Sequence, residues 1–234
     1  MRRAGSRVGV EEVSDLLLIC LTFGTGAVDA ISYLGLGGVF TANMTGNIVL
    51  LGLAAGKAAG PQLLRSAVSL VAFVLGLYVA SRIAGRGERH RAWSAEVKIA
   101  LGLEAVAQAA LLAGWLAASG RPGMGLKAVL VALSGAAMGV QTGAVTALGV
   151  AGVSTTYVTG TLTSLIRGLA TSTGSRRDWL RRALLLAALL VGAGCSGLLI
   201  VDARTVAPVL PLAVTLLVLA VALYVLPRSA SPNP

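Results

Sequence analysis

The chain has 234 residues, of which 56% are hydrophobic and 12% charged, with a formal net charge of +10 and a mean hydropathy of +0.85. A soluble domain of this length needs far more polar surface, so the composition excludes a soluble globular protein and indicates an integral membrane protein. The basic residues cluster between the apolar runs, which is typical of an inner-membrane protein and argues against nucleic acid as a partner.

Six apolar runs are long enough to span a bilayer, which takes about 20 helical residues. They cover residues 15–36, 64–84, 96–118, 126–150, 180–201 and 206–226, and two shorter runs, 41–56 and 155–169, follow the first and the fourth. All are rich in Leu, Ala, Val and Gly and lack the alternating pattern of barrel strands. The sequence therefore predicts an all-α integral membrane protein with two repeated halves of about four helical segments each and six to eight membrane crossings.

These runs also predict the domain organisation. Residues 1–14 form a cytoplasmic N-terminal segment, 15–226 a single membrane domain with halves at about 15–118 and 126–226, and 227–234 a disordered cytoplasmic tail. Arginines precede the first run, as in a signal peptide. That run is too long for a signal core and ends in no small-residue cleavage site, so we expect a retained helix.

An ionisable residue, Asp29, lies deep in the first run, with Ser32 and Tyr33 three and four residues later on the same helical face. A charged group inside a membrane is costly and by default marks an ion path, a proton path or a substrate site. Burial favours the neutral form of a carboxyl group, which would let Asp29 carry a proton. The structural alternative is a carboxylate that pairs with an arginine or faces a loop.

Polar residues open the second segment where lipid is expected, namely Asn43, Thr45, Gly46 and Asn47. Only residues 48–55 are continuously apolar there, about 12 Å of helix, so the segment is either re-entrant or a short tilted helix shielded by its neighbours. A helix that starts at this point exposes N–H groups suited to an anion or a dipole. The alternative is that these residues only cap the helix and let it pack tightly.

The third long run contains a second acidic residue, Glu104, with Gln108 one turn later. Glu104 is a weaker candidate for a proton-carrying group, and the alternative is a carboxylate that pairs with an arginine near a helix end or faces a loop. Cys20 and Cys195 lie in apolar runs without metal-ligand spacing, and His90 lies in a basic loop. We therefore expect no metal, no cofactor and no enzymatic activity.

The chain resembles itself at an offset of 114 residues. Nine of the 22 positions from 30 to 51 are identical, namely Ala30/Ala144, Leu34/Leu148, Gly35/Gly149, Gly38/Gly152, Val39/Val153, Thr41/Thr155, Thr45/Thr159, Gly46/Gly160 and Leu51/Leu165. The second polar stretch thus contributes Thr159, Gly160 and Thr161 as candidate site residues. Asp29 has no acidic counterpart in the second half: it aligns with Gly143, and the neutral Gln141 and Thr142 lie next to that position. Internal repeats recur in transporters, with sites near the repeat interface.

The orientation of the halves depends on the two short segments. If both are re-entrant, the chain crosses six times and the halves are inverted; if both span, it crosses eight times and the halves are parallel. Six crossings place 14 of the 19 basic residues inside and leave Lys57, Arg65, Arg121, Lys127 and Arg204 outside. The basic loop 81–98 is then inside, which favours six crossings, and both alternatives put the two termini in the cytoplasm.

Two ridges of small residues predict close helix packing, Gly52/Gly56/Gly60 and Gly135/Gly139/Gly143. Such ridges let helices approach closely within one subunit or between two copies. Packing within one subunit is the favoured interpretation, and a homodimer is the other arrangement that the sequence leaves open.

The run Gly26-Ala-Val-Asp29-Ala-Ile-Ser32-Tyr33, followed by Phe40-Thr-Ala-Asn43-Met-Thr45-Gly46-Asn47, resembles the YoaK family of bacterial membrane proteins. Length, hydrophobicity and the later stretch 152–161 agree, so the resemblance covers nearly the whole chain. It implies a bacterial polytopic inner-membrane protein with this motif as a signature. The family is a domain family of unknown function, so the resemblance implies no substrate or activity.

We therefore expect a small-solute transporter or channel-like permease, with a proton-coupled mechanism as one form. Asp29 would be the coupling group, and the lipid bilayer and an unknown small solute would be the partners. The alternative is a non-transporting scaffold, sensor or assembly partner, which needs no polar path through the membrane.

Overall fold

The structure is a computed structural model that describes residues 2–84, 93–149 and 158–226. Its regular elements are helices throughout these ranges. They are α1 (Arg2–Gly35), α2 (Met44–Gly56), α3 (Gly60–Ala84), α4 (Ala95–Ala117), α5 (Met124–Ala147), α6 (Val158–Ala170), α7 (Arg176–Asp202), a short 3-10 turn η1 (Arg204–Val206) and α8 (Val209–Tyr224).

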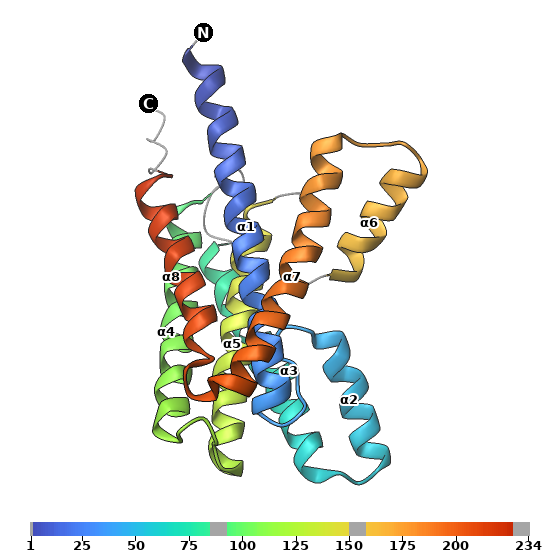
Figure 1. The fold of residues 1–234 in the computed structure, drawn as a ribbon, viewed down its shortest axis with the longest axis vertical. Coiled ribbons are helices and arrows are strands. Elements are labelled where there is room, and N and C mark those ends of the chain that lie inside the picture. The colour runs from blue at the N-terminus through green and yellow to red at the C-terminus, as the bar shows by residue number, and fades with distance from the viewer. Residues whose placement is uncertain (1, 85–92, 150–157, 227–234) are drawn as a thin grey trace.

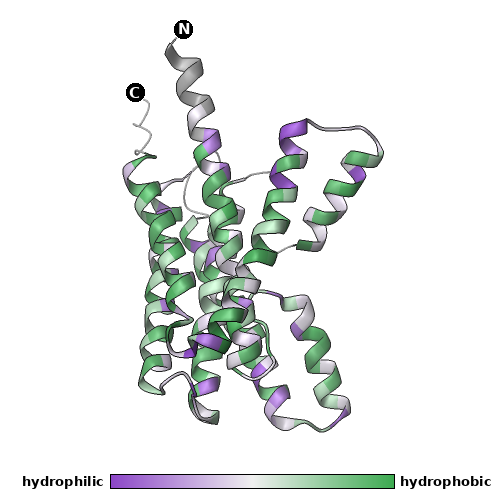
Figure 2. Cartoon of the chain, in the orientation of Figure 1, coloured by the Kyte–Doolittle hydropathy of each residue, from purple (hydrophilic) through white to green (hydrophobic). Residues whose placement is uncertain are grey.

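Six described helices are long and apolar enough to cross a membrane, namely α1, α3, α4, α5, α7 and the η1–α8 unit. This confirms the predicted all-α membrane class. The helices α2 and α6 have 13 residues each, about 20 Å of helix, which is shorter than the roughly 30 Å hydrocarbon core of a bilayer. Apolar residues dominate the long helices over most of their length (Figure 2).

The first helix begins earlier than predicted. The apolar run starts near residue 15, but α1 begins at Arg2 and continues through the polar segment. Near the end of that segment, Asp15 accepts hydrogen bonds from Arg177 and Arg181 of α7, and Glu11 also pairs with Arg177.

The predicted tail, 227–234, and the start of the predicted segment 155–169 lie outside the described residues, as does His90.

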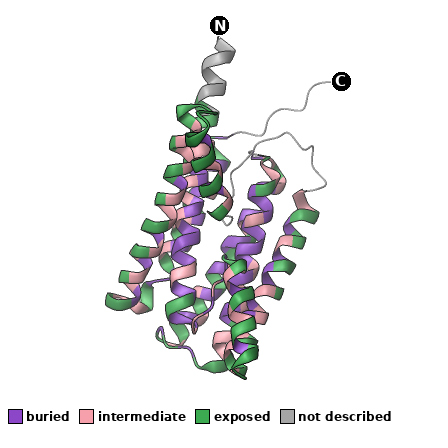
Figure 3. Ribbon diagram, turned by 90° about the vertical axis from the view of Figure 1, so that its right-hand side faces the viewer, coloured by how far each residue is buried: buried purple, intermediate pink, exposed green. Residues whose placement is uncertain are grey.

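The helices α1 and α5 are the most buried of the six long helices and form the centre of the bundle. The main partners of α1 are α7 and α8, and those of α5 are α3 and α4. Each short helix packs on the long helix that follows it, α2 on α3 and α6 on α7 (Figure 1). Exposed residues lie on the outward faces of the helices (Figure 3). Many of them are large apolar residues, as expected for a surface in contact with lipid.

Glycines set the distance at the two main helix crossings. A Cβ atom on Gly139 of α5 would overlap the carbonyl oxygen of Phe73 in α3, and one on Gly26 of α1 would overlap that of Leu189 in α7. The backbones are therefore in contact at both crossings, as small-residue packing in membranes allows. By contrast, Gly52, Gly56 and Gly60 have open space around them. The second predicted ridge thus packs within the chain, and the first lies on its surface.

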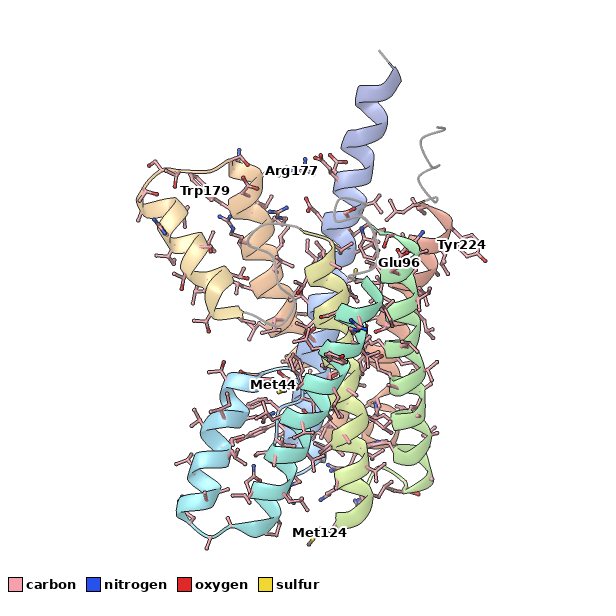
Figure 4. All side chains as sticks on the ribbon, turned by 180° about the vertical axis from the view of Figure 1, so that it is seen from behind. Met44, Glu96, Met124, Arg177, Trp179 and Tyr224 are labelled. Atoms are coloured by element: carbon pink, nitrogen blue, oxygen red, sulfur yellow. The ribbon has the colours of Figure 1, made fainter. Side chains whose placement is uncertain are left out.

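The start of α1 and the end of α8 lie at the same end of the bundle (Figure 1). Arg177, Glu96 and Tyr224 lie toward this end, and Met124 lies at the opposite end (Figure 4). The short helices begin near the middle of the bundle and run outward in opposite directions, α2 away from the termini and α6 toward them (Figure 1). The connection 36–43 therefore turns back from the end of α1 to the middle of the bundle.

Candidate functional site

The carboxylate of Asp29 holds the connection between α1 and α2. Its Oδ1 atom accepts hydrogen bonds from the backbone N–H groups of Thr41 and Ala42, at 2.9 and 2.8 Å. Thr41 and Ala42 are buried, so without this acceptor their N–H groups would lack a partner at membrane depth. Asp29 faces a loop, which was the structural alternative, and it also lines the two cavities described below.

Asn47 fastens the same connection to the helices on its other side. Its Oδ1 accepts from the Phe40 N–H at 3.0 Å, and its Nδ2 donates to the Phe40 carbonyl and, at 3.0 Å, to Ser69 Oγ of α3. Ser69 in turn donates to the Phe40 carbonyl at 2.7 Å. Asn47 is completely buried. Its side chain is therefore a structural anchor, and it lines neither of the two cavities described below.

The start of α2 is capped by its own sequence. The Asn43 side chain accepts a hydrogen bond from the Gly46 N–H at 3.1 Å, which is an ordinary N-cap contact. A Cβ atom on Gly46 would lie 3.0 Å from the Phe40 ring, so glycine keeps the ring close to the helix start. Gly37 and Gly38 have φ angles of +102° and +73°, which lets the chain reverse direction after α1.

Asn43, Thr45 and Gly46 face a cavity of about 390 Å³, here called the polar cavity. Its other described lining residues come from α1, the connection, α6, α7 and the rest of α2, namely Thr25, Asp29, Ala42, Val49, Val158, Thr159 and Leu189. The starts of both short helices therefore border one space. The structure thus brings together five residues predicted from sequence, Asp29, Asn43, Thr45, Gly46 and Thr159.

A second cavity of about 380 Å³, here called the apolar cavity, shares Asp29, Asn43 and Leu189 with the first. Its other lining residues are Gly26, Ala30, Tyr33, Leu34, Phe40 and Ala193. The rings of Tyr33 and Phe40 are stacked, with centroids 5.0 Å apart and an angle of 22° between their planes. Tyr33 was predicted from its spacing to Asp29, and it is 45% exposed. Ser32 points elsewhere and is buried.

The remaining predicted residues of the second half do not line the polar or the apolar cavity. Gly160 and Thr161 follow Thr159 on α6, and Thr161 is buried. Gln141 of α5 donates to Thr25 Oγ1 at 2.8 Å, and Thr25 lines the polar cavity. Gln141 therefore contacts the site through Thr25 and does not line it.

Glu104 and Gln108 form a separate buried cluster between α4 and α8. The Oε1 atom of Glu104 accepts from Gln108 Nε2 at 2.8 Å and from Thr215 Oγ1 at 3.1 Å. Within the described ranges, Glu104 Oε2 and Gln108 Oε1 have no hydrogen-bond partner. Gln108 borders a small cavity of about 20 Å³ together with Ser32 and Ser134. This cluster does not line the polar or the apolar cavity.

The unpartnered atoms of this cluster predict how Glu104 tolerates substitution. Glu104→Gln should leave thermal stability unchanged or raise it, because an amide group can donate to the free Gln108 oxygen and needs no proton to stay neutral. Glu104→Ala should lower stability by about 2–4 kcal/mol, since it opens a cavity and removes the partner of Gln108 and Thr215. Thermal unfolding of the purified variants in one detergent measures both. Equal losses for the two variants would contradict the prediction.

Several site residues escaped prediction from the sequence. Thr25 lies four residues before Asp29, and this helical spacing was a signal that could have revealed it. Ser69 and Leu189 come from distant helices, and nothing in their local sequence marks them. Phe40 belongs to the signature stretch, yet its role as stacking partner of Tyr33 depends on the reversal of the chain at Gly37 and Gly38.

The fold and the site together define a polytopic helical membrane protein with two half-length helices that start beside one shared cavity. Residues 17–223 match the family described as "Protein of unknown function (DUF1275)", so the chain belongs to that family. It is also similar to the UPF0700 transmembrane protein YoaK of Bacillus subtilis (strain 168), with 43% identity over 155 residues. That alignment covers 66% of each chain. No solved structure matches the chain.

Proposed function

We propose that the protein is a small-solute transporter or channel-like permease of the bacterial inner membrane, in which Asp29 is the group that couples transport to protons. The observation that carries this proposal is the polar cavity, where the starts of α2 and α6 meet beside Asp29. Transporter sites commonly lie at the membrane midplane between helices that are interrupted or half-length. A scaffold has no need for a cavity with this lining.

The proposal includes an inverted repeat. The halves α1–α4 and α5–α8 each have the order long, short, long, long. Under the 114-residue offset, α1 corresponds to α5, and α3 corresponds to α7. The contact between α1 and α7 therefore corresponds to the contact between α5 and α3, and these are the two largest helix contacts in the structure. Both contacts use glycines against backbone. Two such halves can alternate between packing arrangements that open the central site to one side or the other.

The proposed orientation places both termini in the cytoplasm. The end of the bundle that holds the start of α1 and the end of α8 also holds the ends of α3 and α6 and the start of α7 (Figure 1). The described residues there include Arg82, Arg167, Arg176, Arg177, Arg181 and Arg182. An excess of basic residues on the cytoplasmic side is the usual rule.

The proposal needs only one copy of the chain, because one copy supplies the whole described lining of the cavity. A homodimer remains a prediction of the sequence.

The proposal predicts that filling the polar cavity blocks solute movement. Thr159 on α6 lines the cavity, and Thr163, one turn later on the same helix, does not. Thr159→Trp should therefore reduce flux to the level of protein-free liposomes, because an indole occupies space that the solute needs. Thr163→Trp adds the same ring to an exposed position and should keep most of the flux.

Flux is measured in proteoliposomes as uptake of radiolabelled small ammonium compounds, small carboxylates and neutral polyols at a fixed pH gradient, and an internal pH dye reports proton movement in the same vesicles. Movement of at least one class above the protein-free rate, lost in Thr159→Trp and kept in Thr163→Trp, supports a transporter. If no class moves, the transporter proposal fails, and the scaffold or sensor becomes the better description. If both variants conduct as well as the unmodified protein, the polar cavity is not the path of the solute and the site proposed here is wrong.

A further inference from the structure

We propose that the polar and apolar cavities beside Asp29 bind a small organic cation, an ammonium group with an apolar body, and that this cation competes with a proton for the Asp29 carboxylate. The inference rests on the proposed function and names its substrate class.

The charge of the lining favours a cation. Asp29 is shared by both cavities, and their described lining residues include no lysine, arginine or histidine. The ion pairs among the described residues join Glu11, Asp15 and Asp178 to arginines, and Asp29 takes part in none of them. Two backbone N–H groups orient the carboxylate through Oδ1 but carry no net charge. An ionised Asp29 therefore lacks a counter-charge that an ammonium group would supply.

The shape and chemistry of the lining favour a cation with an apolar body. Ala30, Leu34 and Ala193 give the apolar cavity aliphatic walls, and the stacked rings of Tyr33 and Phe40 complete it. Aromatic rings attract a cation through their negative faces as well as through apolar contact. Each cavity lies within the range of about 300–1,000 Å³ that is typical of small-molecule sites.

The polar cavity extends the site on the other side of Asp29. Thr25, Thr45 and Thr159 contribute hydroxyl groups, and Asn43 contributes an amide. These neutral groups can hydrogen-bond to a polar substituent or to the water around an ammonium group. A ligand whose ammonium lies at Asp29 would thus contact aliphatic and aromatic groups on one side and neutral polar groups on the other.

An anion fits this site less well. Helix starts attract anions through free N–H groups, and two helices start here. However, the Gly46 N–H of α2 already donates a hydrogen bond to the Asn43 side chain. An anion in the cavity would also lie beside the Asp29 carboxylate, and the described lining holds no basic residue to neutralise the two negative charges. As long as Asp29 is ionised, its negative charge therefore repels an anion in the cavity.

A shared carboxylate links the cation to the proton. Around Asp29, the N-cap and first turn of α2 present Asn43 and Thr45, α6 presents Thr159, and α7 presents Leu189 and Ala193. None of these side chains is ionisable. Tyr33, on α1 itself, is the other titratable group in the described lining. When Asp29 is protonated, the site has no charge for an ammonium group. Binding of one cation to a protonated site therefore releases the Asp29 proton to water, and acidification displaces the cation by the same linkage.

The test uses phenyltrimethylammonium as the probe, with purified full-length protein in detergent and isothermal titration calorimetry. Tetramethylammonium lacks the ring, and benzenesulfonate carries the opposite charge. We expect phenyltrimethylammonium to bind about tenfold more tightly than tetramethylammonium, consistent with an added ring contact. We expect no binding of benzenesulfonate. Affinity should fall as the pH is lowered, and a weakly buffered titration should release up to one proton per cation bound.

Variants assign the effect to the site. Asp29→Asn keeps an oxygen acceptor for Thr41 and Ala42 but removes the charge, so it should abolish the binding and the proton release. Tyr33→Leu keeps an apolar side chain and should weaken phenyltrimethylammonium about tenfold, because both the ring contact and the attraction of the ring for the cation are lost. Tetramethylammonium should be weakened by a smaller factor, because it loses only the attraction for the cation. Asp202→Asn removes one carboxylate from the exposed end of α7 and should behave like the unmodified protein. A melting curve for each variant verifies that it is folded.

The outcomes separate this inference from the proposed function. Binding of benzenesulfonate that equals cation binding, or cation binding that survives in a folded Asp29→Asn variant, overturns the cation site. If proteoliposomes then still move carboxylates or polyols, the protein is a transporter of another substrate class. If the cation binds as expected but no solute moves, the cation site stands and the transporter proposal fails in favour of a sensor.

Discussion

Replacing Gly139 with leucine is expected to destroy most of the folded protein. Gly139 lies where α5 crosses α3, and a Cβ atom there would overlap the Phe73 carbonyl oxygen and lie 2.8 Å from the Leu77 nitrogen. Both are backbone atoms, so the clash cannot be relieved by a rotamer change and the two helices must separate. Overpacking of a well-packed core commonly costs about 1–3 kcal/mol, and a clash with backbone should exceed that range.

Gly52→Leu is the matched control, because Gly52 lies within α2 and a Cβ atom on it would have open space around it. Leucine is a better helix former than glycine by up to about 1 kcal/mol, so this variant should melt at the same temperature or slightly higher. The measurement is the thermal stability of both variants and the unmodified protein in one detergent, together with the yield of monodisperse protein. If Gly139→Leu and Gly52→Leu have the same melting temperature, α3 and α5 do not cross as closely as described here.

The second large effect is expected at Asp29, where two substitutions separate structure from charge. Asp29→Ala removes the acceptor for the N–H groups of Thr41 and Ala42 and leaves both without a partner at membrane depth. A hydrogen bond to a charged group contributes about 1.5–3 kcal/mol, so the loss of two should cost on the order of 3–5 kcal/mol. Asp29→Asn keeps one side-chain oxygen in place and should lose clearly less.

Hydrogen exchange localises this effect. In the Ala variant, the amides of Thr41 and Ala42 should exchange faster than in the Asn variant, while amides of α5 should be equally protected in both. Such a pattern would show that the connection 36–43 opens while the bundle remains folded. Equal melting temperatures for the two variants, with equal exchange at Thr41 and Ala42, would mean that the carboxylate does not hold the connection.

The sequence by itself determined the class of the protein and most helix positions. Spans depend on the length and hydropathy of local runs, and these are read directly from composition, so the predicted runs and the observed helices overlap throughout the described residues. Asp29 was also evident from sequence, because a charge inside an apolar run is costly wherever the helix lies. The polar stretch 43–47 was likewise visible as a break in hydrophobicity before a short apolar run.

Tertiary structure decided which of these residues share a site. The reversal at Gly37 and Gly38 brings Thr41 and Ala42 back to Asp29, while it buries Asn47 against Ser69. Asn43 and Asn47 look equivalent in sequence, yet one lines the cavities and the other anchors a loop, because they face opposite sides of the α2 start. Glu104 was grouped with Asp29 for its chemistry alone. Helix packing places it between α4 and α8, outside both cavities, since local sequence carries no information about which distant helix will cover a given face.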